Sequence, residues 1–73
     1  MSALGYIPFG ELVNDRAESA MELETCERLY KLIDKTDVDG PELIRKLEER
    51  INGNIAIIAA IDRELAIRKA VAA

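Results

Sequence analysis

Few side chains in this chain of 73 residues are of types that carry covalent or metal chemistry. Histidine is absent, and the single cysteine, Cys26, excludes both an intrachain disulfide and a cluster of thiolate ligands. A reactive cysteine is favoured by cationic, partly exposed surroundings, whereas Cys26 falls on an apolar helix face beside Glu27. We therefore interpret Cys26 as a small buried hydrophobic residue.

The remaining candidates for chemistry are carboxylates. Glu24 and Glu27 share a helix face, but carboxylate metal sites in helical bundles typically use a Glu-x-x-His pattern, so we interpret this pair as a solvated face. The stretch 37–40, Asp-Val-Asp-Gly, invites comparison with a calcium-binding loop. Aligned on its glycine, however, the loop has Lys35 and Lys46 at two positions that require acidic ligands. We predict no catalytic residue, no metal and no cofactor, and we interpret the protein as non-enzymatic.

The strongest pattern in the chain is an apolar seam in its C-terminal part, residues 41–71, which predicts one long helix. Apolar residues widen the seam on either side at Leu43 and Ile55, and Ile57 lies just beyond it. A band this broad is more than one antiparallel helix can cover. At alternating spacings of three and four, the seam positions are Ile44, Leu47, Ile51, Asn54, Ile58, Ile61, Leu65 and Arg68.

Continuity of this helix depends on the stretch Asn52-Gly53-Asn54. A turn there would make Asn54 the cap of a new helix. The seam keeps its phase across Gly53, however, and an isolated glycine costs about 1 kcal/mol, which flanking isoleucines can offset. We predict a continuous helix, with a bend or break at Gly53 as the alternative. In a continuous helix, Asn54 is expected to fix register by pairing with a second asparagine.

A first helix is expected over residues 11–35, with a start anywhere from Pro8 to Leu12. Its N-terminal half is the weaker, because polar residues interrupt the seam there. Residues 1–10 form an irregular apolar arm that we expect to cover the end of the bundle, and residues 36–40 form the turn. The first-helix seam is Leu12, Arg16, Ser19, Leu23, Cys26, Tyr30 and Ile33.

Together these elements predict an all-α fold: an antiparallel helical hairpin that self-associates into a helical bundle. Folding at the turn brings Tyr30 opposite Leu47, and Leu12 opposite Leu65. A chain this short buries only about 60% of its unfolded surface alone, so self-association is favoured. The expected interface, in a homodimer or larger assembly, contains Ile44, Leu47, Ile51, Asn54, Ile55, Ile57, Ile58, Ile61 and Leu65.

Charge supports a protein partner better than nucleic acid. From residue 11 to residue 27 there are six acids and one base, a net of −5, whereas residues 42–69 hold five acids and six bases, a net of +1. The acidic helix face is expected to meet a basic partner protein. The alternative function is a dimeric hairpin that binds nucleic acid, which the overall charge of −4 disfavours. The partner-facing acids are Glu11, Asp15, Glu18 and Glu22, and the alternative would use the ends bearing Arg63, Arg68 and Lys69.

The longest apolar run, residues 55–61, is far shorter than the ~20 residues that span a bilayer. The N-terminal stretch lacks the pattern of a signal peptide. Both features favour the cytosol as the compartment and exclude a membrane-spanning segment.

Overall fold

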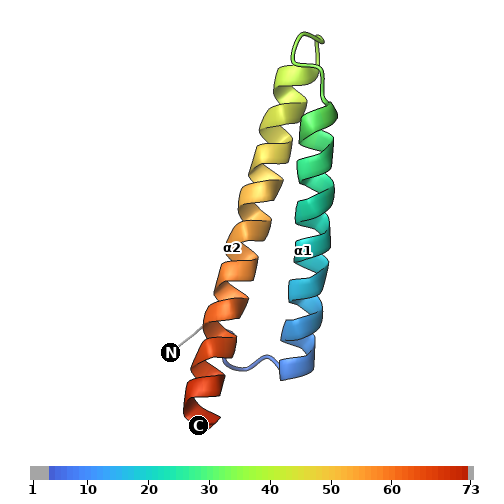
Figure 1. Ribbon diagram of the computed structural model, residues 1–73. Coiled ribbons are helices and arrows are strands. Elements are labelled where there is room, and N and C mark those ends of the chain that lie inside the picture. Colours follow the sequence, from blue (N-terminus) through green and yellow to red (C-terminus); the bar gives the residue numbers. More distant parts are fainter. Residues whose placement is uncertain (1–3, 73) are drawn as a thin grey trace.

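The protein is an antiparallel hairpin of two helices, seen in a computed structural model that describes residues 4–72. Helix α1 spans Phe9–Leu32 and helix α2 spans Gly40–Ala72, and the two lie side by side along a rod of 53 × 19 × 16 Å (Figure 1). The described residues contain no strand. The predicted all-α hairpin is confirmed.

Helix α1 begins at Phe9, within the expected range from Pro8 to Leu12, because Pro8 acts as its N-cap. Pro8 has the extended angles φ −57° and ψ 146°, and its carbonyl accepts the amide of Leu12 at 3.1 Å. Proline has a φ that suits this position, and it has no N–H to leave without a partner. The helix ends three residues early, at Leu32, because Ile33 is extended with ψ 128°.

Local hydrogen bonds in the turn explain this early end. The carboxylate of Asp34 accepts the amide of Thr36 at 2.9 Å and its hydroxyl at 2.6 Å. Aspartate and threonine used in this way offer the backbone an alternative to the helical ladder. The amide of Gly40 then donates to the carbonyl of Asp37 at 3.1 Å, and α2 begins at Gly40, ahead of Pro41. The turn therefore covers residues 33–39, earlier than the expected 36–40.

Helix α2 runs without interruption through Asn52, Gly53 and Asn54, so the predicted continuous helix is confirmed. No described glycine has positive φ, and a Cβ added at Gly53 would meet nothing within 4 Å. The glycine is therefore not required by the backbone geometry. Packing of the isoleucines on either side carries the helix through a position of low propensity.

The predicted seams face each other. All seven positions of the first seam, which ends at the C-cap residue Ile33, and all eight of the seam in α2 are buried or half-buried, with Leu12, Cys26 and Ile61 the most enclosed apolar side chains. Two contacts between the helices fix the register: Arg16 with Asp62, and the Tyr30 hydroxyl with Glu48 at 3.4 Å. Since Tyr30 was expected opposite Leu47, the observed register agrees to within one residue.

The described part of the expected arm, residues 4–8, crosses from the start of α1 to the C-terminal part of α2 (Figure 1). It forms a turn in which the amide of Ile7 donates to the carbonyl of Leu4 at 3.1 Å. Residues 1–3 of that arm lie outside the described part of the chain. Over residues 4–72, neither helix has a stretch apolar and long enough to cross a bilayer.

Candidate functional site

Helix α2 has two flanks, one on each side of its seam, and they face different surroundings. We call the first the Ile57 flank: it contains Arg50 and Ile57 of α2 and faces Asp15 and Glu22 of α1. An ion pair joins Glu22 to Arg50 at 3.6 Å, and Asp15 and Ile57 line the same hollow. On the same flank, Leu29 of α1 and Leu43 of α2 are exposed.

We call the second the Ile55 flank. Ile55 lies one heptad from both Glu48 and Asp62, the residues that contact Tyr30 and Arg16 of α1. The guanidinium of Arg16 grips Asp62 with two hydrogen bonds, of 2.5 Å and 3.1 Å. Bidentate geometry of this kind is the strong form of an ion pair. Here it links the two helices at Arg16, the one charged position in the seam of α1.

An open apolar hollow of about 170 Å³ lies on the Ile57 flank, close to the arm. Leu12 and Ile61, its most buried lining residues, form its floor. The arm supplies part of the wall, and Asp15 is the one charged residue in the lining. The hollow is lined by Leu4, Ile7, Leu12, Asp15, Ile57, Ala60 and Ile61.

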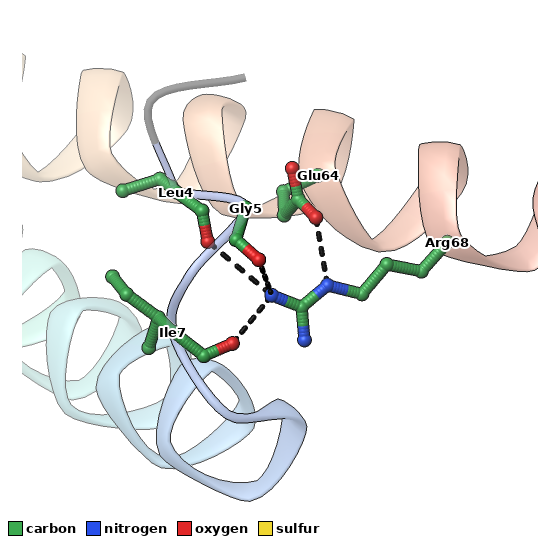
Figure 2. A network of polar contacts seen from close by, with 5 residues as sticks. All are labelled: Leu4, Gly5, Ile7, Glu64 and Arg68. Carbon is green, nitrogen blue, oxygen red and sulfur yellow. Dashed lines mark hydrogen bonds and ion pairs between the residues drawn. The ribbon is translucent and has the colours of Figure 1, made fainter. Parts of the chain in front are cut away.

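Arg68 holds the arm in place (Figure 2). Its Nη2 donates to the carbonyl oxygens of Leu4 at 3.2 Å and Gly5 at 3.5 Å, and also to the carbonyl of Ile7, while its Nε donates to Glu64 at 2.7 Å. The carboxylate side chain of Glu64 is only 4% exposed. A turn that aims several carbonyl oxygens at one point is a natural site for a cation, and Arg68 fills it.

This network corrects the expected role of Arg68 as part of a basic end of the helix. The arginine is half-buried, and its guanidinium is directed inward to the arm and to Glu64. Of the three basic residues proposed for nucleic-acid contact, only Arg63 and Lys69 are exposed. Two separated cations give little of the clustered charge that displaces counterions from a phosphate backbone.

The four acids predicted to face a partner lie along one edge of α1, bordering the Ile57 flank. Glu22 is matched by Arg50 at 3.6 Å, and Glu18 accepts a long hydrogen bond of 3.5 Å from Asn14. Asp15 is half-buried beside the hollow and has no hydrogen bond or ion pair with another described residue. Glu11 is exposed one turn away.

The residues predicted to form an interface divide into two groups. Seven of them, all seam positions, are buried or half-buried within the hairpin: Ile44, Leu47, Ile51, Asn54, Ile58, Ile61 and Leu65. The other two, Ile55 and Ile57, are exposed by 49% and 47%. The side-chain amide of Asn54 donates to the backbone carbonyl of Arg50 at 3.0 Å, a hydrogen bond within α2. The pairing of Asn54 with a second asparagine stays a prediction.

Sequence reasoning missed Glu64, Asp62 and Ala60. A signal for the first two was present, because Arg16 and Arg68 are the charged residues in the two apolar seams and each requires a carboxylate within reach. Glu64 precedes Arg68 by four residues, the spacing of a helical ion pair. Ala60 carries no such signal, since its place in the hollow depends on where the arm returns.

Of the side chains considered for chemistry, Cys26 is enclosed, Glu24 is paired and Glu27 is exposed. The thiol of Cys26 is buried in the seam, with the residue 3% exposed, and Glu24 lies 3.5 Å from Arg28. Within residues 4–72, no three acidic or cysteine side chains are grouped closely enough to hold a metal ion. No protein-family model, curated protein or solved structure matches this chain.

Proposed function

We propose that this protein is a non-enzymatic protein–protein interaction or regulatory protein that works as a homo-oligomeric helical bundle. The observation that carries the proposal is the exposure of Ile55 and Ile57 on opposite flanks of the hairpin, by 49% and 47%. Burying apolar area contributes about 25 cal/mol per Å², so each flank gains stability from a further element packed against it. A second hairpin covers one flank of the first, which leaves the other for a different partner.

The second copy packs over the Ile55 flank. Val13 lies on this side of α1, two residues from Asp15 and therefore across the seam from it, and is 44% exposed. Asp62, which borders the flank, is already matched by Arg16. The exposed Val13 and Ile55 on this flank, together with the matched Arg16–Asp62 pair, favour a like partner, because two copies can then bury apolar side chains against each other.

Sedimentation equilibrium of matched variants tests this proposal. The wild type is expected to have about twice the chain mass of 8.1 kDa at tens of micromolar. Ile55→Lys places a charge in the interface, and we expect it to weaken the dimer by about a hundredfold or more. Ile57→Lys has the same chemistry on the opposite flank and is expected to keep the wild-type mass.

Two results would contradict the proposal. One is a wild type that is folded and monomeric at tens of micromolar. The other is a dimer that Ile57→Lys dissociates and Ile55→Lys leaves intact, which would move the second copy to the Ile57 flank. Helicity measured by circular dichroism on the same samples shows that each variant is folded.

A further inference from the structure

The hollow on the Ile57 flank has the size of one apolar side chain. Its volume is about 170 Å³, and apolar cavities of about 150 Å³ in proteins hold a group as large as benzene. The floor is firm, because Leu12 and Ile61 are only 1% and 3% exposed. The wall contributed by the arm is fixed in turn by the hydrogen bonds from Arg68 to the arm carbonyls. The hollow is therefore formed before anything enters it.

The edge of the hollow carries negative charge on the α1 side. Asp15 lies in the lining, and its carboxylate has no ion pair or hydrogen bond with another described residue. Glu11 and Glu18, one turn away in either direction, are exposed. An apolar recess bordered by a row of carboxylates complements a group that is apolar at one point and positively charged beside it.

We propose that this hollow receives one apolar side chain from a basic amphipathic segment of a partner protein, with a neighbouring lysine or arginine of that segment paired to Asp15. The inference rests on the proposed function, because it specifies the partner that binds the flank left open by self-association. Helical spacing of three or four residues in the partner puts its apolar anchor and its cation on one face. The anchor supplies affinity through burial, and the cation supplies orientation and a faster encounter.

A second copy of this chain is the weaker candidate for the same place. Its net charge of −4 opposes approach to an edge that is itself acidic. Arg50, a cation of α2 on this flank, is already paired with Glu22 at 3.6 Å. A second copy would therefore offer few unpaired cations to this row of acids, whereas a basic segment supplies the positive charge that the row lacks.

Fluorescence anisotropy with a synthetic helix measures this binding. The probe is a labelled peptide of about 15 residues with leucines on one face and lysines on the other, long enough to be helical when bound. A matched peptide with serines in place of the leucines keeps the charge and removes the anchor. We expect the leucine peptide to bind the wild type at least about tenfold more tightly than the serine peptide.

Three variants then separate the hollow from the charge. Ala60→Leu fills the hollow and should weaken the leucine peptide about tenfold. Asp15→Asn removes the carboxylate at its edge and should weaken the peptide about threefold. Glu27→Gln makes the same change in net charge on the other side of α1, where Glu27 is exposed, and should alter affinity by about twofold at most.

Equal affinity of the Ala60→Leu variant and the wild type for the leucine peptide overturns the inference. Nitrogen-15 spectra of the wild-type protein test the site without a variant. Amide signals that move on addition of the leucine peptide support the site if they centre on Asp15 and Ala60, and reject it if they centre on Glu27. A lower assembly mass for Ala60→Leu in sedimentation assigns the hollow to a second copy, which also overturns it. Self-association is measured by mass and peptide binding by affinity, so the failure of one proposal is distinguishable from that of the other.

Discussion

The two ends of the hairpin are built from the same pair of helices but are closed to different extents. At the arm end, residues 4–8 lie against α2, and Leu12, Ile61 and Glu64 are all 3% exposed or less. At the turn end, residues 29–47, no apolar side chain reaches that level, and Leu32 and Val38 are almost fully exposed at 80% and 93%. Two helices in contact bury some seam side chains on their own, such as Cys26 at 3% exposed, and the arm adds a third segment at the end where Leu12 and Ile61 lie.

This difference in burial between the two ends indicates which contacts stabilise the fold. At the arm end, a short irregular segment adds apolar cover and brings carbonyl oxygens to Arg68, so packing and polar contacts reinforce each other. At the turn end, closure depends on local hydrogen bonds such as those from Thr36 to Asp34. We therefore expect substitutions at the arm end to be the more costly, and we expect the turn end to open first.

Loss of the Arg68 guanidinium should have the largest effect. Arg68→Met keeps the apolar stem but removes the hydrogen bonds to the arm carbonyls and the ion pair with the buried Glu64. We expect the free energy of unfolding to fall by about 3 kcal/mol, as for other ion pairs broken in low-exposure sites. Chemical denaturation at one fixed protein concentration measures this. Arg63→Met, at an exposed arginine, is the control and should change stability by about 0.5 kcal/mol at most.

The same deletion made at both ends tests the comparison directly. Leu12→Ala removes a side chain that is 1% exposed and should cost about 3 kcal/mol, because a cavity is left beside the hollow. Leu47→Ala, near the turn, removes a half-buried side chain and should cost about half as much. Both are measured by the same denaturation. Equal losses would mean that the arm does not tighten its end of the core.

Two glycines of α2 should respond to alanine with opposite signs. A Cβ at Gly40, where the turn enters α2, would overlap the carbonyl oxygen of Asp34, so Gly40→Ala should destabilise by about 2 kcal/mol. Gly53 has helical geometry and open space around its Cβ position, so Gly53→Ala should stabilise by about 0.5–1 kcal/mol. Thermal melts of the two variants beside the wild type decide the signs. Stabilisation by Gly40→Ala would show that the close approach at the turn is not needed.

The long-range arrangement of the helices was predictable because it follows from one periodic pattern. The seams from Leu12 to Ile33 and from Ile44 to Arg68 identified the facing residues, and the phase across Gly53 identified a continuous helix. The helix ends were less predictable, since they depend on individual side chains. The hydrogen bond from Thr36 to Asp34, for example, favours an end to α1 at Leu32, three residues before the end that the periodic pattern predicts.

The arm end was the part that the sequence did not specify. Residues 4–8 have no period, so nothing in their order states that they turn back toward Arg68 or that they enclose a hollow with Ala60. Arg68 was placed correctly in the seam, but the backbone carbonyl oxygens that it binds belong to Leu4, Gly5 and Ile7, which are 64, 63 and 61 positions away in the sequence. Contacts between irregular backbone and a distant side chain have no pattern that sequence reasoning can read.

Lowering the pH should reduce the stability of the two ends only slightly, and this is the smallest effect that we expect. Hydrogen bonds from Arg16 hold the pKa of Asp62 below its ordinary value, and hydrogen bonds from the Thr36 hydroxyl and amide do the same for Asp34. A carboxyl group whose pKa is lowered on folding contributes stability above its unfolded pKa, about 3.9, and loses it as the pH falls through the folded pKa. Both contributions are thus present at neutral pH and disappear in the acid range below about pH 4.

Carbon-13 shifts of the two side-chain carboxyl groups, followed from neutral to acid pH, measure this. Both should titrate below ordinary aspartate. Arg16→Gln should raise the pKa of Asp62 and leave that of Asp34 in place, whereas Thr36→Val should do the reverse, because the two sites are at different ends of the hairpin. The melting-temperature difference between wild type and Asp62→Asn should narrow as the pH falls, since protonation of Asp62 weakens the Arg16 contact that the variant lacks. A difference that widens toward acid pH would show that the charge on Asp62 opposes folding and that the bidentate contact with Arg16 does not form in solution.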